Sequence, residues 1–196
     1  LDPIDLMDGI ELEALLDKRV QGLMQPEMEK SILKHTKKEF PEGIQGHGSD
    51  ALRFTFFALA STGRDIRFDT QRLLGYRNFC NKLWNAARFV LLQPLPEKVK
   101  VLPTKTLVDV WIFHRLHEVI ADCAQHIQSY RFDLWAKTLY DFVWSDFCDW
   151  YIEASKLGLN GSQADNSKHL LHRILADILK LLHPLIPFIT EEIWQQ

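Results

Sequence analysis

An unbroken apolar period of 3.6 residues between Gln71 and Leu92 constrains the fold of this chain more than any other sequence feature. Apolar residues at that spacing line one face of an α-helix. Asp69 or Thr70 can cap the start, because a short polar side chain accepts hydrogen bonds from the first N–H groups of a helix. A helix of this kind gains most of its stability by burying its apolar face. The segment therefore predicts a long helix packed against other elements.

The rest of the chain after this helix alternates similar apolar patterns with residues that break helices. Pro94, Pro96 and Pro103 predict a stiff connector, and Pro184 with Pro187 predicts an extended crossover. Long helices joined by short loops predict an antiparallel, all-α bundle. The predicted elements are a helix from Thr104 or Thr106 to about 129, a helix over about 132–156, a polar loop near 158–166, a helix over about 167–183, and a further helix that starts at Thr190.

Residues 1–69 have a different pattern. The stretch 11–46 is charged and helix-prone and is broken at Gly22 and Pro26, which predicts an inserted helical hairpin. Residues 48–50 open a helix to about position 60, and residues 64–69 alternate charged and apolar side chains like a short strand. We therefore expect a small α/β segment over residues 1–69 and the helical bundle over residues 70–196.

The composition is that of an ordinary globular protein, with 46% hydrophobic and 25% charged residues. No apolar run approaches the roughly 20 residues of a bilayer-spanning helix, and no export leader is recognisable, so we expect a cytoplasmic protein. Cys80, Cys123 and Cys148 are far apart, so neither a disulfide nor a zinc site is expected. The chain has no Gly-rich phosphate loop and no Ser/His/Asp arrangement, and no catalytic residue is predicted.

The outer face of the first bundle helix is unusual. Four cations between Gln71 and Leu92 are accompanied by no acidic residue, although the whole chain carries a net charge of −3. Asn78, Lys82, Asn85 and Phe89 follow the spacing i, i+4, i+7, i+11 and form one narrow stripe. Amides can bind base edges, cations can neutralise phosphates, and an aromatic ring can stack on an unpaired base. Two interpretations stay open: an RNA-binding surface, or aromatic residues that pack against neighbouring helices with Asn residues that cap loops.

Two other groups of residues are interpreted structurally. The acids between Asp141 and Glu153 are read as a solvated helix face, since no His lies at i+3 or i+4 from them. Trp135, Trp144 and Trp150 are expected mostly in the core, because aromatic side chains dominate packing in helical bundles.

Residues 76–89, with the sequence YRNFCNKLWNAARF, closely resemble the R-N-F-x-N-K-x-W-N-A-x-R-F segment of valyl-tRNA synthetases. Isoleucyl and leucyl enzymes share the bundle, but their equivalents of two of the blocks differ. The resemblance covers nearly the whole chain. The other blocks that agree are GSDALRF at 48–54, similar to the helix after the KMSKS loop of class I synthetases, GRDIRFD at 63–69, FCDWYIE at 147–153, and LHPLIPFITE at 182–191.

The resemblance implies that residues 1–69 belong to a stem-contact fold and residues 70–196 to an anticodon-binding bundle. The full-length enzymes of the family attach valine to tRNA(Val) with ATP and Mg, in a catalytic domain marked by the HIGH and KMSKS signatures. Neither signature occurs in this chain. We therefore expect a fragment that follows the KMSKS loop, holds no cofactor of its own and is inactive alone.

The resemblance also implies particular site residues. Lys82 and Phe89 lie where the family contacts anticodon bases, and Ile152 matches an apolar position of the same pocket. The expected partner is tRNA(Val), bound by a monomer, with no membrane and no DNA; the alternative is a stand-alone helical module that docks a protein through Trp84 and Phe89. The residues expected to flank the anticodon or to contact the tRNA backbone are Arg77, Asn78, Asn81, Asn85 and Arg88.

Overall fold

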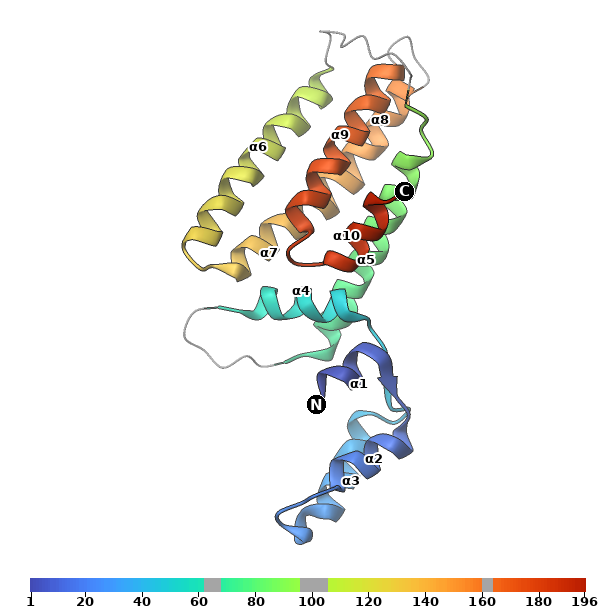
Figure 1. Ribbon diagram of the computed structural model, residues 1–196, viewed down its shortest axis with the longest axis vertical. Helices are drawn as coiled ribbons and strands as arrows, with labels where there is room; N and C mark the ends of the chain where they lie inside the picture. The colour runs from blue at the N-terminus through green and yellow to red at the C-terminus, as the bar shows by residue number, and fades with distance from the viewer. Residues whose placement is uncertain (62–67, 96–105, 160–163) are drawn as a thin grey trace.

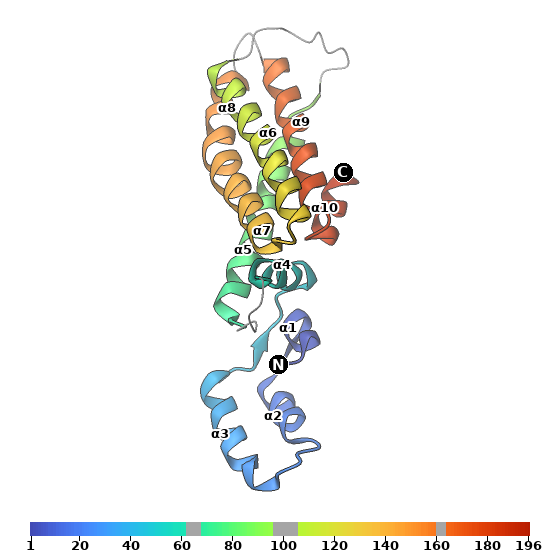
Figure 2. The same ribbon diagram turned by 90° about the vertical axis from the view of Figure 1, so that its left-hand side faces the viewer.

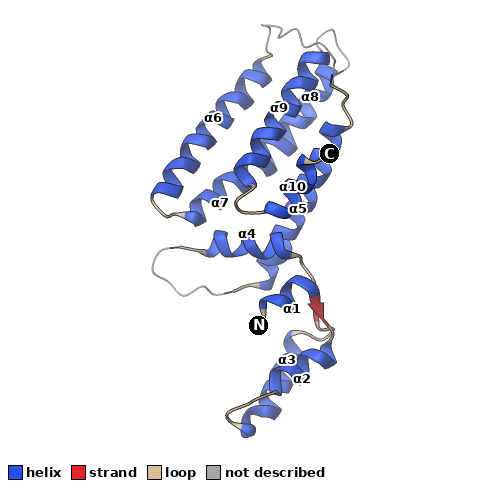
Figure 3. Ribbon diagram, viewed as in Figure 1, coloured by secondary structure: helices blue, strands red, loops and turns tan. Residues whose placement is uncertain are grey.

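The structure, a computed structural model, describes residues 1–61, 68–95, 106–159 and 164–196. Helices dominate these residues, and the strands form one small sheet (Figure 3). The predicted all-α bundle with a small α/β segment is therefore confirmed. Most of the predicted strand at 64–69 and most of the proline connector at 94–103 lie outside the described residues. No described helix has the length and apolar character needed to cross a membrane.

The bundle packs its long helices side by side, with α6 and the α7–η2–α8 run flanking α9 and α5 (Figures 1 and 2). Helix α10 closes the side next to α5 and α9. The elements are α5 (Thr70–Leu91), α6 (Leu107–Gln128), α7 (Phe132–Asp141), the π-helix η2 (Phe142–Tyr151), α8 (Ile152–Leu159), α9 (Ala164–Leu182) and α10 (Pro187–Trp194).

Two helix starts predicted from the sequence are confirmed by their caps. The Asp69 side chain accepts a hydrogen bond of 2.9 Å from the Gln71 N–H and so begins α5. Thr106 and Asp109 form a capping box at the start of α6, in which each side chain binds the backbone N–H of the other residue. Each cap satisfies N–H groups that have no partner inside the helix.

Three features of the bundle differ from the prediction. The helix that begins at Phe132 widens into η2 before it returns to α-geometry, whereas a uniform α-helix was expected. Helix α9 begins at Ala164, three positions before the predicted start. Pro187 does not prolong an extended crossover to Thr190; it occupies the first turn of α10. A proline is favoured there because its missing N–H would have had no partner in the helix.

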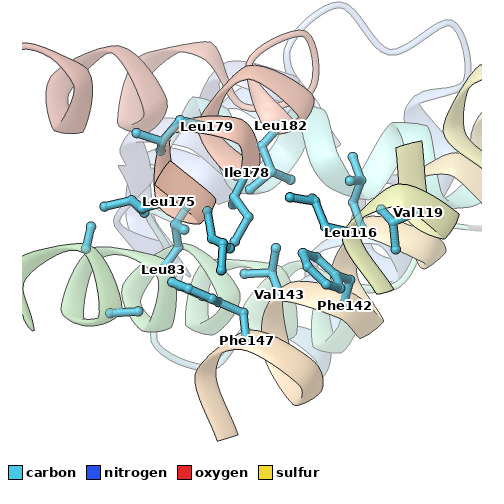
Figure 4. Packing of buried hydrophobic residues seen from close by; sticks show 14 of the residues in the cluster. Leu83, Leu116, Val119, Phe142, Val143, Phe147, Leu175, Ile178, Leu179 and Leu182 are labelled. Carbon is cyan, nitrogen blue, oxygen red and sulfur yellow. The ribbon is translucent and has the colours of Figure 1, made fainter. Parts of the chain in front are cut away.

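The bundle core forms where the apolar faces of α5, α6, the α7–η2 run and α9 meet (Figure 4). It is built largely from leucine, isoleucine and phenylalanine, with the Leu83 and Phe79 side chains of α5 fully buried. The apolar arc predicted for α5 therefore faces the core. Its buried members are Phe79, Leu83, Ala86, Ala87 and Val90, whereas the buried Leu73, nearer the start of α5, belongs to a second apolar cluster.

The first part of the chain forms a smaller lobe below the bundle (Figure 1). Strands β1 (Gly9–Ile10) and β2 (Ile44–Gln45) pair antiparallel. They close the neck of a hairpin made by α2 (Leu12–Val20), η1 (Pro26–Met28) and α3 (Glu29–Glu39), and α1 (Pro3–Asp8) precedes them. Gly43 makes this neck possible, because its φ is +82° and a Cβ atom there would lie 2.3 Å from the Ile10 carbonyl oxygen.

Helix α4 (Ser49–Leu59) lies across the end of the bundle, between the bundle and the smaller lobe (Figures 1 and 2). Its Ala51 and Leu52 side chains belong to the lower apolar cluster with Leu6, Leu15 and others. Its Phe54 side chain belongs to the bundle core. One helix thus contributes side chains to both clusters.

Candidate nucleic-acid interface

The outer face of α5 has two sides, and each side lies against different neighbouring elements. Lys82 and Phe89, on the stripe predicted to bind bases, lie next to the η2–α8 run, where they meet Asp149 and Lys156. On the other side of α5, Trp84, Arg88 and Leu91 line a hollow. Ile193 of α10 and Gln196 also belong to its lining. The residues predicted to bind RNA therefore do not form one continuous surface.

Lys82 is held between an acid and an aromatic ring. Its Nζ atom lies 2.6 Å from Oδ1 of Asp149 and 3.8 Å from the centre of the Trp144 ring. A lysine ammonium at that distance from an indole face is attracted by the negative face of the ring. The Lys82 side chain is 25% exposed and the Asp149 side chain 50% exposed, so both remain accessible at the surface.

The Trp144 ring rests on an aromatic stack that fixes its position. Trp144 stacks on Tyr140 with ring centres 5.5 Å apart and planes 13° apart. Tyr140 in turn stacks on the buried Phe79 ring at 5.0 Å. Because Phe79 is part of the bundle core, the floor beneath Lys82 is rigidly supported. Rigid support of this kind preorganises a binding surface.

Phe89 is partly buried and packs against the bundle core. The Nζ atom of Lys156, on α8, lies 5.7 Å from the centre of the Phe89 ring, and Lys156 is itself paired with Glu153 at 2.6 Å. The ring is therefore neither in the deep interior nor free in solvent. Asn78 and Asn85, the remaining members of the stripe, are exposed.

Ile152, the third residue carried over from the resemblance, begins α8 and is only 6% exposed. Its side chain is part of the bundle core, so its surface toward solvent is small. The nearby Trp150, by contrast, is 69% exposed.

The exposed position of Trp150 was missed by sequence reasoning, which placed the tryptophans mostly in the core. Trp135 is buried and Trp144 is partly buried, in line with that expectation. The π-helix η2 has more residues per turn than an α-helix, so a uniform α-helical period would place position 150 on the buried face. A dense run of aromatic residues gives no sequence signal for such a change of period.

Arg77 and Asn81 lie in a hollow of about 360 Å³ between α5, α4 and α10. His47 and Asp50 line the same hollow. Burial lowers the pKa of His47, and the positive charge of Arg77 adds to that effect. Arg77 and Asn81 therefore lie in a different hollow from the surface around Lys82.

The remaining polar groups give no support to metal or thiol chemistry within the described parts of the chain. No group of three His, Cys, Asp or Glu side chains there could hold a metal ion. Burial raises the pKa of the Cys80, Cys123 and Cys148 thiols to about 12, which keeps them protonated at neutral pH. The accessible side chains beside α5 are cations, amides, aromatic rings and carboxylates such as Asp149, which are groups suited to binding.

Comparison with known proteins finds a similar kind of domain. Residues 109–196 match the family described as the anticodon-binding domain of tRNA ligase.

Over its whole length the chain is similar to valine–tRNA ligases, and the resemblance seen in the sequence blocks is confirmed. It is 53% identical to the enzyme of Xanthomonas campestris pv. campestris (strain B100) over 200 residues, which are 21% of that protein. It is 54% identical to the enzyme of Francisella tularensis subsp. tularensis (strain SCHU S4 / Schu 4) over 201 residues, or 22% of that protein, and 52% identical to the enzyme of Stenotrophomonas maltophilia (strain R551-3) over 200 residues, or 21%. The chain thus spans about a fifth of the length of these curated relatives.

Proposed function

We propose that this chain is the tRNA-recognition segment of a valine–tRNA ligase and that it binds the anticodon of tRNA(Val) beside α5. The observation that carries the proposal is the match of the whole chain, at 52–54% identity, to proteins named valine–tRNA ligase. The anticodon-binding domain match over residues 109–196 supports the same role for the bundle.

The surface between α5 and the η2–α8 run is the proposed contact with the anticodon. It offers a lysine over an aromatic floor, a partly exposed phenylalanine and exposed amides, which together can bind unpaired bases. In this proposal Phe89 supplies the stacking plane and Lys82 a hydrogen-bond donor. Ile152 supplies the apolar wall beneath them, and the exposed Trp150 offers a further stacking surface on the same helical run.

The flanking residues are assigned to the tRNA backbone. Asn78 and Asn85 lie on the same stripe as Lys82 and can bind ribose or base edges. Arg77, Asn81 and Arg88 are directed toward α4 and α10, so we propose that they contact phosphates on the other side of α5. In this arrangement the tRNA straddles α5.

The full-length enzyme would attach valine to tRNA(Val) with ATP and Mg, in a catalytic domain that this chain does not include. The segment itself would bind tRNA as a monomer in the cytoplasm, hold no cofactor and leave tRNA uncharged when alone. The extent of the two domains is likewise a proposal: a stem-contact part over residues 1–69, with a hairpin inserted at about 11–46, and the anticodon-binding bundle over residues 70–196.

The proposal is tested by measuring the dissociation constant of the chain for tRNA(Val) and for a tRNA with a different anticodon, across a range of salt concentrations. We expect tighter binding of tRNA(Val) and a linear loss of log affinity with log salt, because neutralised phosphates release counterions. Equal affinity for both tRNAs with a flat salt response would contradict the proposal. That result would favour the alternative, a stand-alone helical module that docks a protein through Trp84 and Phe89.

A further inference from the structure

We propose that Asp149 is a specificity-determining residue, which holds Lys82 so that the site accepts an unpaired base and disfavours a backbone phosphate. The inference rests on the function proposed above and deepens it. It assigns a role to an acid that the sequence pattern places on a solvated face.

The geometry joins two helices that are distant in the sequence. Lys82 of α5 and Asp149 of η2 are 67 positions apart, and their charged atoms approach to 2.6 Å. The same ammonium lies 3.8 Å from the Trp144 ring centre. Lys82 is therefore held from two directions, by a carboxylate and by an aromatic face. A lysine is otherwise a flexible point charge with three donors.

The two lysines of the neighbouring α7–η2–α8 run are also paired with acidic side chains. Lys137 is paired with Asp141, and Lys156 with Glu153. The η2 side of the site therefore presents rings and hydrogen-bonding groups without a strong positive field. The arrangement differs from the usual basic footprint of a nucleic-acid binder.

This balance separates the two kinds of ligand that RNA offers. A phosphate that approaches Lys82 meets the like charge of Asp149 and must displace it. An uncharged base meets no such repulsion and can stack on the partly exposed Phe89 ring. It can also donate to Asp149 and accept from Lys82, since the two side chains present an acceptor and a donor side by side. Asp149 thus lowers the affinity for RNA of any sequence more than it lowers the affinity for the anticodon loop of tRNA(Val).

The test replaces Asp149 with asparagine, which keeps the size of the side chain and removes its charge. We expect Asp149→Asn to raise affinity for a mismatched tRNA by about twofold to fivefold, the range that an exposed ion pair can account for. Affinity for tRNA(Val) should change less, so the ratio of the two dissociation constants falls. The slope of log affinity against log salt for the mismatched tRNA should steepen by about 0.7, since the freed lysine neutralises one more phosphate of an unpaired strand.

Two further variants test whether the effect is specific to the Lys82–Asp149 pair. Glu118→Gln removes an exposed acid that is paired with Arg115 on α6, outside the surface between α5 and the η2–α8 run, and it should leave the ratio and the slope unchanged. The double variant Lys82→Gln/Asp149→Asn should abolish the gain, because the gain acts through Lys82.

An Asp149→Asn protein with the wild-type ratio and slope, or with weaker binding of both tRNAs, overturns this inference. Such a result leaves the proposed function standing if Lys82→Gln still weakens binding of tRNA(Val). If Lys82→Gln has no effect on tRNA(Val), the proposed contact with the anticodon is itself wrong.

Discussion

The Asp50 carboxylate accepts a hydrogen bond of 2.7 Å from the backbone N–H of Ile189, although 139 positions separate the two residues. The other carboxylate oxygen accepts from the Phe188 N–H at 3.3 Å. Asp50 thus caps the first turn of α10 from a different helix. Arg53, one turn later on α4, donates to the carbonyls of Pro184 and Leu185 in the turn that follows α9. The α4 helix therefore binds both the end of α9 and the start of α10.

Replacing Asp50 with alanine should destabilise the chain by about 0.5–2 kcal/mol, the range found for the loss of a helix N-cap. The N–H groups of Phe188 and Ile189 would lose their acceptor. Urea unfolding followed by circular dichroism measures the change. Asp122→Ala, which removes an exposed acid from α6, is the matched control and should change the free energy of unfolding by no more than about 0.5 kcal/mol.

Tyr151→Phe should lower the free energy of unfolding by about 1.5–3 kcal/mol, the range for hydrogen bonds to charged groups. The Tyr151 hydroxyl donates to Oδ1 of Asp109 at 3.0 Å in the interior, and the variant leaves that oxygen without this donor. Chemical denaturation provides the value, with Tyr130→Phe as control because Tyr130 is 73% exposed. Equal stability of the two variants would show that the buried bond contributes nothing.

Removing the Phe89 ring should weaken binding of tRNA(Val) by about 1–3 kcal/mol, the range for base–aromatic stacking. Phe89→Ala tests the whole ring, and Phe89→Leu retains apolar bulk against the core while removing the flat face. Lys82→Ala should also weaken binding. Filter binding measures the affinities, and circular dichroism checks that each variant is folded. Trp194→Ala, at an exposed ring on α10, should bind like the wild type.

The stability of the chain should fall as the pH drops through the range in which His47 titrates. The pKa of His47 is lowered in the folded state from 6.5, first by burial and then by the charge of Arg77. The unfolded chain therefore binds a proton at a higher pH than the folded chain does. The contribution of this residue is complete above pH 6.5 and is lost as the pH falls through the folded-state pKa. Thermal melts of wild type and His47→Gln between pH 5 and 8 should show a shallower pH dependence in the variant.

Much of the bundle could be predicted because the sequence signals for its helices come from residues that are close together in the chain. The 3.6-residue period of α5 identifies its buried face, and the caps at Asp69 and Thr106 lie next to the N–H groups that they bind. Pro187 was misplaced because a proline that ends an extended segment and one that begins a helix look alike in sequence.

The candidate site was only partly predictable, because its geometry depends on residues from another helix. The stripe through Lys82 and Phe89 follows from spacing alone. Its neighbours Asp149 and Trp144 could not be assigned, since no local pattern states which helix packs beside α5. The exposure of Trp150 depends on the π-helical turn, which has no sequence signature of its own.

Helix α4 couples the packing of the two apolar clusters of the molecule. Leu52 anchors it in the lower lobe and Phe54 anchors it in the bundle, only two positions apart on a single rigid rod. The same helix binds the end of α9 and the start of α10 through Arg53 and Asp50. A substitution that loosens α4 is therefore expected to disturb both clusters and the α9–α10 corner together.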